Sequence, residues 1–123
     1  MKIGETLYVT SRKEWRMWLA KHHRSRQEIW LVFCMKASGK PSIAYDVAVE
    51  EAICYGWIDS QQRPMDEERF ARRFTPRRAD SQWSESNKSR ALKLLREGKM
   101  TLSGKALLPD EVLKAWNDAQ GMR

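Results

Sequence analysis

The pattern of apolar and polar positions divides the chain into four helical and four extended stretches. Apolar residues recur every three or four positions in segments that start after Ser11, after Ser42, after Asp80 or Ser81, and at Pro109. Extended runs, either alternating or continuously apolar, cover residues 6–9, 29–35, 57–60 and 69–75. This order predicts an α+β fold in a single domain over residues 1–123, with a mostly antiparallel sheet of about four strands and helices packed on it.

The first helix is signalled at both of its ends. Ser11 and Glu14 have the spacing of a capping box, in which each side chain bonds the backbone N–H of the other residue. Large residues on one helix face should meet the core: Trp15, Trp18, Leu19 and His22. At the expected C-terminus, ring nitrogens of His22 and His23 can satisfy free carbonyl groups, so we assign both histidines a structural role.

The sequence also predicts the central strand of the sheet and the second helix. Residues 29–35 form an apolar run that is too short for a typical helix, and they predict a central strand. Ser42 can cap a helix that Gly56 ends. The acidic residues of this helix are expected to point to solvent: Asp46, Glu50 and Glu51.

The next two strands are predicted to form a hairpin. Trp57 and Asp59 share one face of its first strand, and a polar connection over 61–68 is long enough to be mobile. Beyond the hairpin, the helix capped by Asp80 or Ser81 should end at Gly98. A loop around residues 103–104 and a last helix opened by Pro109 complete the chain.

Composition indicates an ordinary folded protein. Hydrophobic residues make up 41% of the 123 residues and charged residues 32%. The longest apolar run, 29–35, is far shorter than the about 20 residues that a membrane span needs, and the N-terminus lacks the pattern of a signal peptide. We therefore expect a cytoplasmic protein without membrane insertion. Cys34 and Cys54 have no metal-ligand spacing, and reduced, buried cysteines are the favoured interpretation.

The formal net charge of +7 is clustered and makes an anionic partner plausible. The basic residues fall into three groups, in the first helix and its end, around the hairpin, and in the third helix: Arg12, Lys13, Arg16, Lys21, Arg24 and Arg26; Arg69, Arg72, Arg73, Arg77 and Arg78; Lys88, Arg90, Lys93, Arg96 and Lys99. Each group could equally be a solvated face.

Residues 56–87 concentrate the aromatic, charged and hydroxyl residues that packing does not require. In a structural interpretation, Asp59 and Arg77 form a partly buried ion pair that fixes the hairpin against the third helix. Ser84 and Asn87 would then satisfy backbone groups of that helix.

In a binding interpretation, Arg77 or Arg78 holds an anion at the N-terminus of the helix that begins near Ser81, where free N–H groups favour negative charge. Trp57 and Trp83 would form the walls of this pocket. The candidate ligand-binding residues are therefore Trp57, Asp59, Arg77, Trp83, Ser84 and Asn87.

Three ordered motifs closely resemble the YdeI/OmpD-associated family of small bacterial proteins: Gly56-Trp57-Ile58-Asp59-Ser60, Phe74-Thr75-Pro76-Arg77-Arg78, and Ser81-x-Trp83-Ser84-x-x-Asn87. The resemblance covers roughly residues 8 to 104. Longer members continue into a further helical segment rich in Arg and Lys, whereas this chain closes with Leu107-Leu108-Pro109 and one helix, so we interpret it as a short form.

The resemblance implies a binding or interaction module in envelope or antimicrobial (bacteriocin) stress tolerance, whose partner is a small anionic ligand or a protein. No cofactor and no catalytic residue can be carried over from it, and we expect no metal site. One alternative is a nucleic-acid-binding protein that uses clustered Arg with Trp57, Phe70, Phe74 and Trp83. A second is an enzyme of unknown reaction, which the sequence supports less because Ser84 has no identifiable base and Asp59 no nearby histidine.

Overall fold

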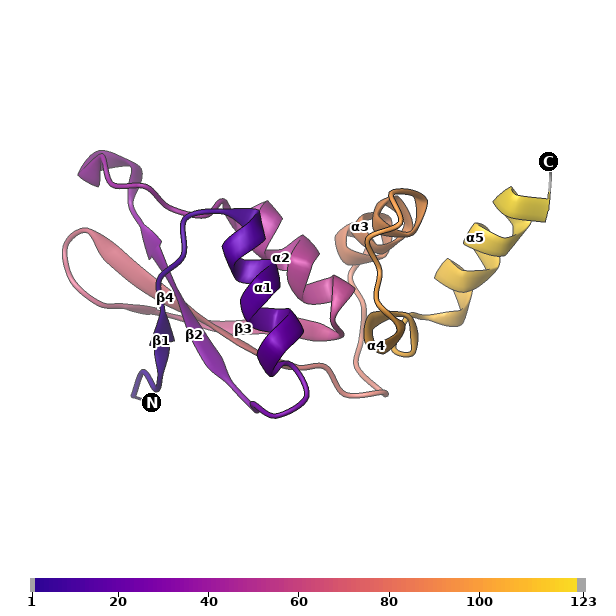
Figure 1. Cartoon of the computed structure of the whole chain (residues 1–123), viewed down its shortest axis with the longest axis horizontal. Helices are drawn as coiled ribbons and strands as arrows, with labels where there is room; N and C mark the ends of the chain where they lie inside the picture. The colour runs from indigo at the N-terminus through magenta and orange to yellow at the C-terminus, as the bar shows by residue number, and fades with distance from the viewer. Residues whose placement is uncertain (1, 122–123) are drawn as a thin grey trace.

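The computed structural model describes residues 2–121 and combines one sheet with helices gathered on one face and at one end of it (Figure 1). The elements along the chain are β1 (Thr6–Leu7), α1 (Arg12–His22), β2 (Ile29–Cys34), the short 3₁₀ helix η1 (Lys36–Ser38), α2 (Tyr45–Cys54), β3 (Trp57–Pro64), β4 (Arg69–Pro76), α3 (Glu85–Arg96), α4 (Leu102–Lys105) and α5 (Asp110–Gly121).

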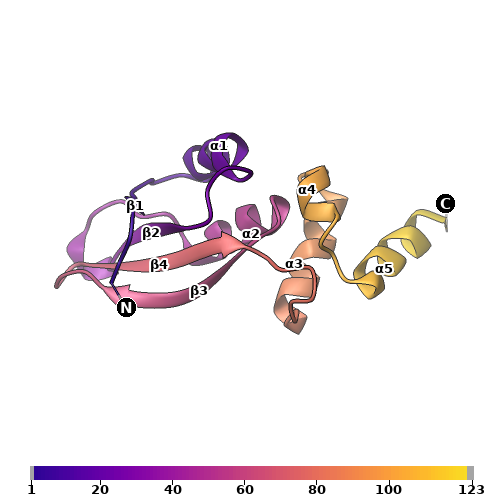
Figure 2. The same cartoon turned by 90° about the horizontal axis from the view of Figure 1, so that it is seen from below.

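The sheet has the strand order β1-β2-β4-β3. β1 pairs with β2 in parallel, and the other two pairs are antiparallel. In the second view, α1 and α2 lie on one face of the sheet, while no helix covers the opposite face (Figure 2). The predicted α+β fold with a mostly antiparallel sheet of about four strands is therefore confirmed.

β2 lies in the interior of the sheet and carries its most buried residues. Its residues from Ile29 to Phe33 are all buried, as the continuous apolar run predicts. Ile29, Leu31 and Phe33 belong to the core between the sheet and the helices. Because side chains alternate between the two faces of a strand, Cys34 at the end of β2 faces away from this core.

The signals at the ends of α1 are confirmed. Ser11 Oγ accepts a hydrogen bond from the Glu14 backbone N–H at 3.2 Å. Trp15 and Leu19 are fully buried on the face that packs on the core. At the other end, the Leu19 carbonyl oxygen accepts the His23 backbone N–H at 2.9 Å and also lies 2.8 Å from Nδ1 of the His23 ring, so this ring adds a second contact at the helix C-terminus.

Two predicted helix caps are wrong. α2 begins at Tyr45, and Ser42 instead accepts a hydrogen bond from the Cys34 backbone N–H at 3.0 Å. α3 begins later than predicted, because Ser84 rather than Asp80 or Ser81 caps it and accepts from the Asn87 N–H at 3.1 Å. Both segments hold more than one residue that can cap a helix, and tertiary packing selects among them.

The expectation that Glu50 and Glu51 point to solvent is also wrong. Glu50 is 7% exposed and Glu51 is 0% exposed. Arg12 of α1 contacts both carboxylates, and Nη1 of Arg16 donates to Glu51 at 2.8 Å. Lys93 of α3 bonds Glu50 at 3.0 Å. The acids are buried because three cations from neighbouring helices compensate their charge.

The hairpin is longer than predicted and its loop is shorter. β3 continues to Pro64, so only residues 65–68 connect it to β4. A register shift between Asp59 and Gln62 marks a bulge, which interrupts the alternation on which the sequence prediction relied.

The segment predicted as a loop around residues 103–104 contains the short helix α4. Thr101 caps it, with its Oγ1 accepting from the Gly104 N–H at 3.2 Å. Thr101 Oγ1 also donates to the Cys54 carbonyl at 2.6 Å. α4 is thereby fixed to the C-terminus of α2, a contact between segments that are far apart in sequence.

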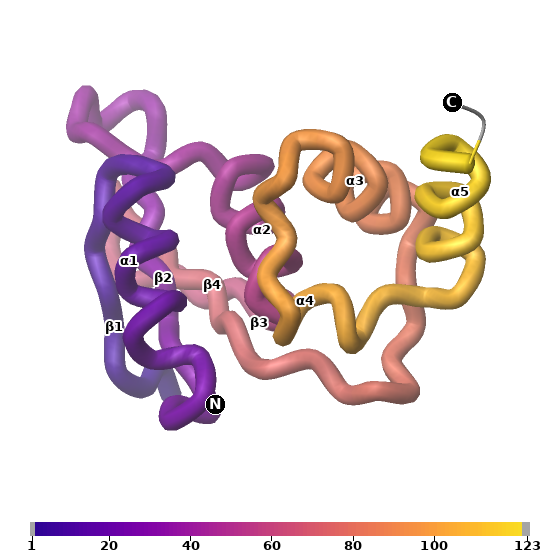
Figure 3. Tube along the Cα trace, turned by 45° about the vertical axis from the view of Figure 1, so that its right-hand side comes forward, coloured from indigo at the N-terminus to yellow at the C-terminus, as the bar shows by residue number. Residues whose placement is uncertain are grey.

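α5 lies at the end of the molecule farthest from the sheet (Figure 3). Its contacts are with α3. Val112 is buried on its inner face, and Trp116 and Leu113 pack more loosely against the core. Within residues 2–121, no helix has the length and apolar character that crossing a membrane requires.

Candidate functional site

Trp57, the first candidate residue, is part of the core. Its side chain is 1% exposed and packs edge-on against Trp18, with ring centroids 5.8 Å apart. Its Nε1 donates to the His23 carbonyl at 3.3 Å, so the one polar atom of the ring is also satisfied. In this structure Trp57 therefore packs in the core and does not form the wall of an open pocket.

Asp59 is held by two residues that the sequence analysis did not select. Arg72 Nε donates to Asp59 Oδ2 at 2.5 Å, and the Tyr45 hydroxyl donates to the same oxygen at 3.1 Å. Asp59 pairs directly with Phe74 across the hairpin. Arg72 lies two positions from Phe74 and thus on the same face, which places its guanidinium beside Asp59.

The ion pair considered between Asp59 and Arg77 does not form. Arg77 makes no salt bridge with any carboxylate of residues 2–121. Its Nη1 instead donates to Ser81 Oγ at 2.9 Å and to the Gln82 carbonyl at 3.2 Å. The guanidinium stacks on Trp83, 3.8 Å from the ring centroid. The fold therefore brings the candidate residues Arg77 and Trp83 into direct contact.

Arg77 is a buried arginine with two hydrogen-bond donors that are unsatisfied within residues 2–121. It is 5% exposed, and its Nε and Nη2 are buried without a hydrogen-bond partner among the described residues. Burial lowers the pKa of Arg77 to about 10, and the negative charge of Asp59 offsets this only in part. A buried donor without an acceptor is costly, and in the described part of the chain Arg77 has two such nitrogens, although its Nη1 is hydrogen-bonded.

Ser84 has the structural role that the first interpretation gave it, whereas the Asn87 side chain bonds a side chain and not a backbone group. Ser84 caps α3 through the Asn87 backbone N–H. The Asn87 side chain accepts from Arg90 Nη1 at 3.1 Å, and Arg90 also reaches Asp46 of α2 at 2.7 Å. These bonds connect the first turns of α3 to α2.

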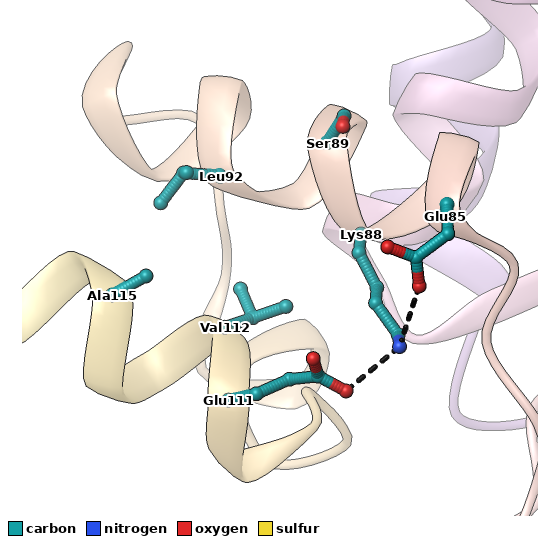
Figure 4. Close-up of a pocket in the computed structure, with 7 residues that line it drawn as sticks. All are labelled: Glu85, Lys88, Ser89, Leu92, Glu111, Val112 and Ala115. Atoms are coloured by element: carbon teal, nitrogen blue, oxygen red, sulfur yellow. Dashed lines mark hydrogen bonds and ion pairs between the residues drawn. The ribbon is translucent and has the colours of Figure 1, made fainter.

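One cavity lies between α3 and α5 and has a volume of about 180 Å³. Its floor is apolar, formed by Leu92, Val112 and Ala115 (Figure 4). At its edge, Lys88 Nζ lies 2.9 Å from Glu85 and 2.7 Å from Glu111, and this bridge joins the two helices. None of the six candidate residues lines this cavity.

The aromatic residues named for nucleic-acid stacking differ in exposure. Trp57 and Phe74 are buried in the core, and Phe70 stacks on Phe33 with centroids 5.3 Å apart. Trp57 and Phe74 are therefore not free to stack on bases, whereas Phe70 and Trp83 are only partly buried. Within residues 2–121, no group of three or more His, Cys, Asp or Glu side chains is placed to hold a metal ion.

Comparison with known proteins gives a family but no described activity. No curated protein and no solved structure matches the chain. A family model described as a domain of unknown function, DUF8412, matches residues 7–107, which extend from the end of β1 through α4. Since the match covers most of the chain, the protein belongs to the DUF8412 family.

Proposed function

We propose that this protein is a small binding module whose ligand presents an anionic group to Arg77. The observation that carries the proposal is the pair of unpartnered donors, Nε and Nη2, on a side chain that is 5% exposed. These two nitrogens lie on one edge of the guanidinium and point the same way. That edge matches the two oxygens of a carboxylate or phosphate in a bidentate contact.

The segment that covers Arg77 is the part of the protein that we expect to move when a ligand binds. Residues 77–84 connect β4 to α3 without helix or strand, and most of them are exposed. Figure 3 shows this connection as a long extended trace. Ser81, Gln82 and Trp83 all contact the guanidinium from this segment. Because Nε and Nη2 are buried in this structure, part of this segment must move aside before a ligand can reach them.

The cellular role follows from the resemblance to the YdeI/OmpD-associated family. Arg77, Trp83, Ser84 and Asn87 all lie in the motifs that carry this resemblance. We place the binding module in envelope or antimicrobial stress tolerance on this basis, with a small anion or an acidic group of a protein as its ligand.

Thermal unfolding with inorganic phosphate and with acetate, at constant ionic strength, tests the anion site. A ligand that binds only the folded state adds about 2.7 kcal/mol at a concentration of 100 Kd. We expect the melting temperature of the wild type to rise with one or both anions. Arg77→Met should abolish the rise, because a methionine side chain fills similar space without donors.

Arg78→Met is the matched control, since Arg78 is the exposed neighbour of Arg77. It removes the same formal charge and should keep the full response to anions. Without added anion, Arg77→Met should be at least as stable as the wild type, because it removes a buried, incompletely bonded cation. A wild type that responds to neither anion, or an Arg77→Met variant that responds like the wild type, would refute the proposal.

A further inference from the structure

A second cavity, distant in sequence from Arg77, lies where β2 ends. Its volume is about 240 Å³. The residue after β1, the last residue of β2, the loop before α2, the β3–β4 connection and the first residue of β4 all contribute to it. These are Tyr8, Cys34, Lys40, Asp66 and Arg69. A thiol, a phenol, two cations and a carboxylate thus line one opening at the surface.

Two cations, Lys40 and Arg69, line the same cavity as Cys34. The pKa of Lys40 is raised mainly by Glu68 and, to a smaller extent, by the charge of Cys34. The pKa of Arg69 is raised mainly by Asp66, and Cys34 again contributes. Because both cations share one cavity lining with Cys34, they would face negative charge that forms on its sulfur.

The acids that accompany these cations fix them in the cavity wall. Lys40 Nζ bonds Glu68 Oε1 at 3.0 Å. Arg69 donates from Nε and Nη2 to Asp66 Oδ2 at 2.9 and 2.8 Å. The Arg69 guanidinium donates two hydrogen bonds to the Asp66 carboxylate, so the hairpin connection defines its position in the cavity wall.

Tyr8 completes the surroundings of the thiol. Burial raises the pKa of Tyr8, and the neighbouring Cys34 raises it further, so the phenol stays neutral. The Tyr8 hydroxyl donates to the Pro41 carbonyl at 2.5 Å. This contact fixes the ring in the lining of the cavity.

Cys54 provides a contrast within the same chain. It is 0% exposed, and burial raises its pKa to about 11. A thiol of this kind is largely unreactive, because the thiolate is the nucleophile and the reagent cannot reach it. Cys34 is a free thiol as well, but it is only partly buried and opens into the cavity. The sequence prediction that both cysteines are buried therefore fails for Cys34.

We propose that Cys34 is a covalent modification site at which a low-molecular-weight disulfide forms a mixed disulfide with the protein. The thiol first gives its proton to water. The thiolate sulfur then attacks one sulfur of the reagent, so that a bond forms between Cys34 and this sulfur while the S–S bond of the reagent breaks. The other half leaves as a thiolate and takes a proton from water. The reagent is the oxidant and is reduced, and Cys34 is oxidised.

Lys40, Arg69 and Tyr8 assist the two charged stages of this step. The cations line the cavity in which negative charge forms on Cys34 and passes to the leaving sulfur. The Tyr8 hydroxyl can donate to a sulfur once it turns away from the Pro41 carbonyl. Thiolates next to Lys or Arg are the reactive ones in proteins. The site is independent of the anion site at Arg77, because it shares no residue with that site.

Incubation of the reduced protein with glutathione disulfide, followed by intact-mass and peptide mass spectrometry, tests the proposal. We expect one glutathione adduct per chain, located on Cys34, while Cys54 stays unmodified. Lys40→Met and Tyr8→Phe should slow the reaction at least about threefold. Lys40 is exposed and Tyr8 is 50% exposed, so these substitutions leave the core intact.

Lys36→Met is the matched control, because Lys36 is an exposed lysine of η1 that does not line the cavity. It should react at the wild-type rate. Slowing in Lys40→Met or Tyr8→Phe alone identifies the group that assists the thiolate. The proposal is overturned if no adduct forms on the folded protein, if Cys54 reacts as fast as Cys34, or if both variants react like the wild type.

Discussion

Arg16 donates from Nη1 to Oε1 of Glu51 at 2.8 Å and thereby connects α1 to a fully buried carboxylate of α2. The same guanidinium reaches the Lys99 carbonyl beyond α3 at 2.9 Å. Arg12 bonds the other oxygen of Glu51. One buried charge is thus shared by two arginines, and three segments that are far apart in sequence converge on it.

Removal of the Glu51 carboxylate should destabilise the protein strongly. Glu51→Ala leaves two arginines without their buried partner, and breaking such a group costs about 3 kcal/mol or more. Urea unfolding followed by tryptophan fluorescence measures the loss. Glu111→Ala is the control, since Glu111 is an exposed acid whose side chain is 65% accessible, and it should change the free energy of unfolding by less than about 1 kcal/mol. Equal stability of the two variants would contradict the role assigned to Glu51.

Glu50 should make stability depend on pH in the acidic range. Burial alone would raise its pKa, but hydrogen bonds from Arg12 and Lys93 outweigh burial and lower the pKa below 4.5. The unfolded chain therefore takes up a proton before the folded protein does. The contribution of Glu50 to stability is complete above about pH 4.5 and is lost as the pH falls through its lowered pKa.

The free energy of unfolding, measured by urea titration from pH 7 to pH 3, checks this expectation. The wild type should lose more stability than Glu50→Gln over the acidic half of this range, because the glutamine carries no titrating carboxylate. Parallel pH profiles for the two proteins would show that Glu50 does not contribute.

Gly104 should tolerate no side chain. A Cβ atom at this position would lie 2.3 Å from the Cys54 carbonyl oxygen and 2.8 Å from the Ile53 carbonyl oxygen, and both are backbone atoms that cannot turn aside. Gly104→Ala must therefore separate α4 from the end of α2. We expect a loss of stability of about 2 kcal/mol or more, as for other overpacked positions, visible as a lower melting temperature.

Gly121→Ala serves as the comparison for this prediction. Gly121 lies in the last turn of α5, and a Cβ atom there would meet nothing within 4 Å. Alanine favours the helix over glycine, so this variant should be as stable as the wild type or slightly more stable. Similar melting temperatures for Gly104→Ala and the wild type would mean that α4 does not pack closely on α2.

Local pattern was sufficient for the fold class and for most elements. Helical spacing located α1, and a capping box identified its first turn, because both signals depend on residues within a few positions of each other. The apolar run at 29–35 predicted the central strand for the same reason. The extent of β3 was not predictable, because a bulge after Asp59 breaks the alternation that identifies a strand.

The candidate site was predictable in composition but not in geometry. The sequence identified Asp59 and Arg77 as candidates, but the register of the hairpin makes Arg72 the ion-pair partner of Asp59. Tyr45, the second partner of Asp59, comes from another element. Nothing in a local pattern signals such partners, since they depend on which face of a strand meets which helix.

The sequence by itself determined that the chain forms an α+β domain with a central apolar strand and an excess of positive charge, because periodicity and composition act over short distances. Only the tertiary structure decided which charges are buried and which are satisfied. In the structure, the buried carboxylate of Glu51 is paired with two arginines. Two donors of Arg77 have no hydrogen-bond partner within residues 2–121. Cys34 lines a cavity, whereas Cys54 is buried. The physical reason is that desolvation and hydrogen bonding depend on every neighbour in space, and packing brings these neighbours from distant parts of the chain.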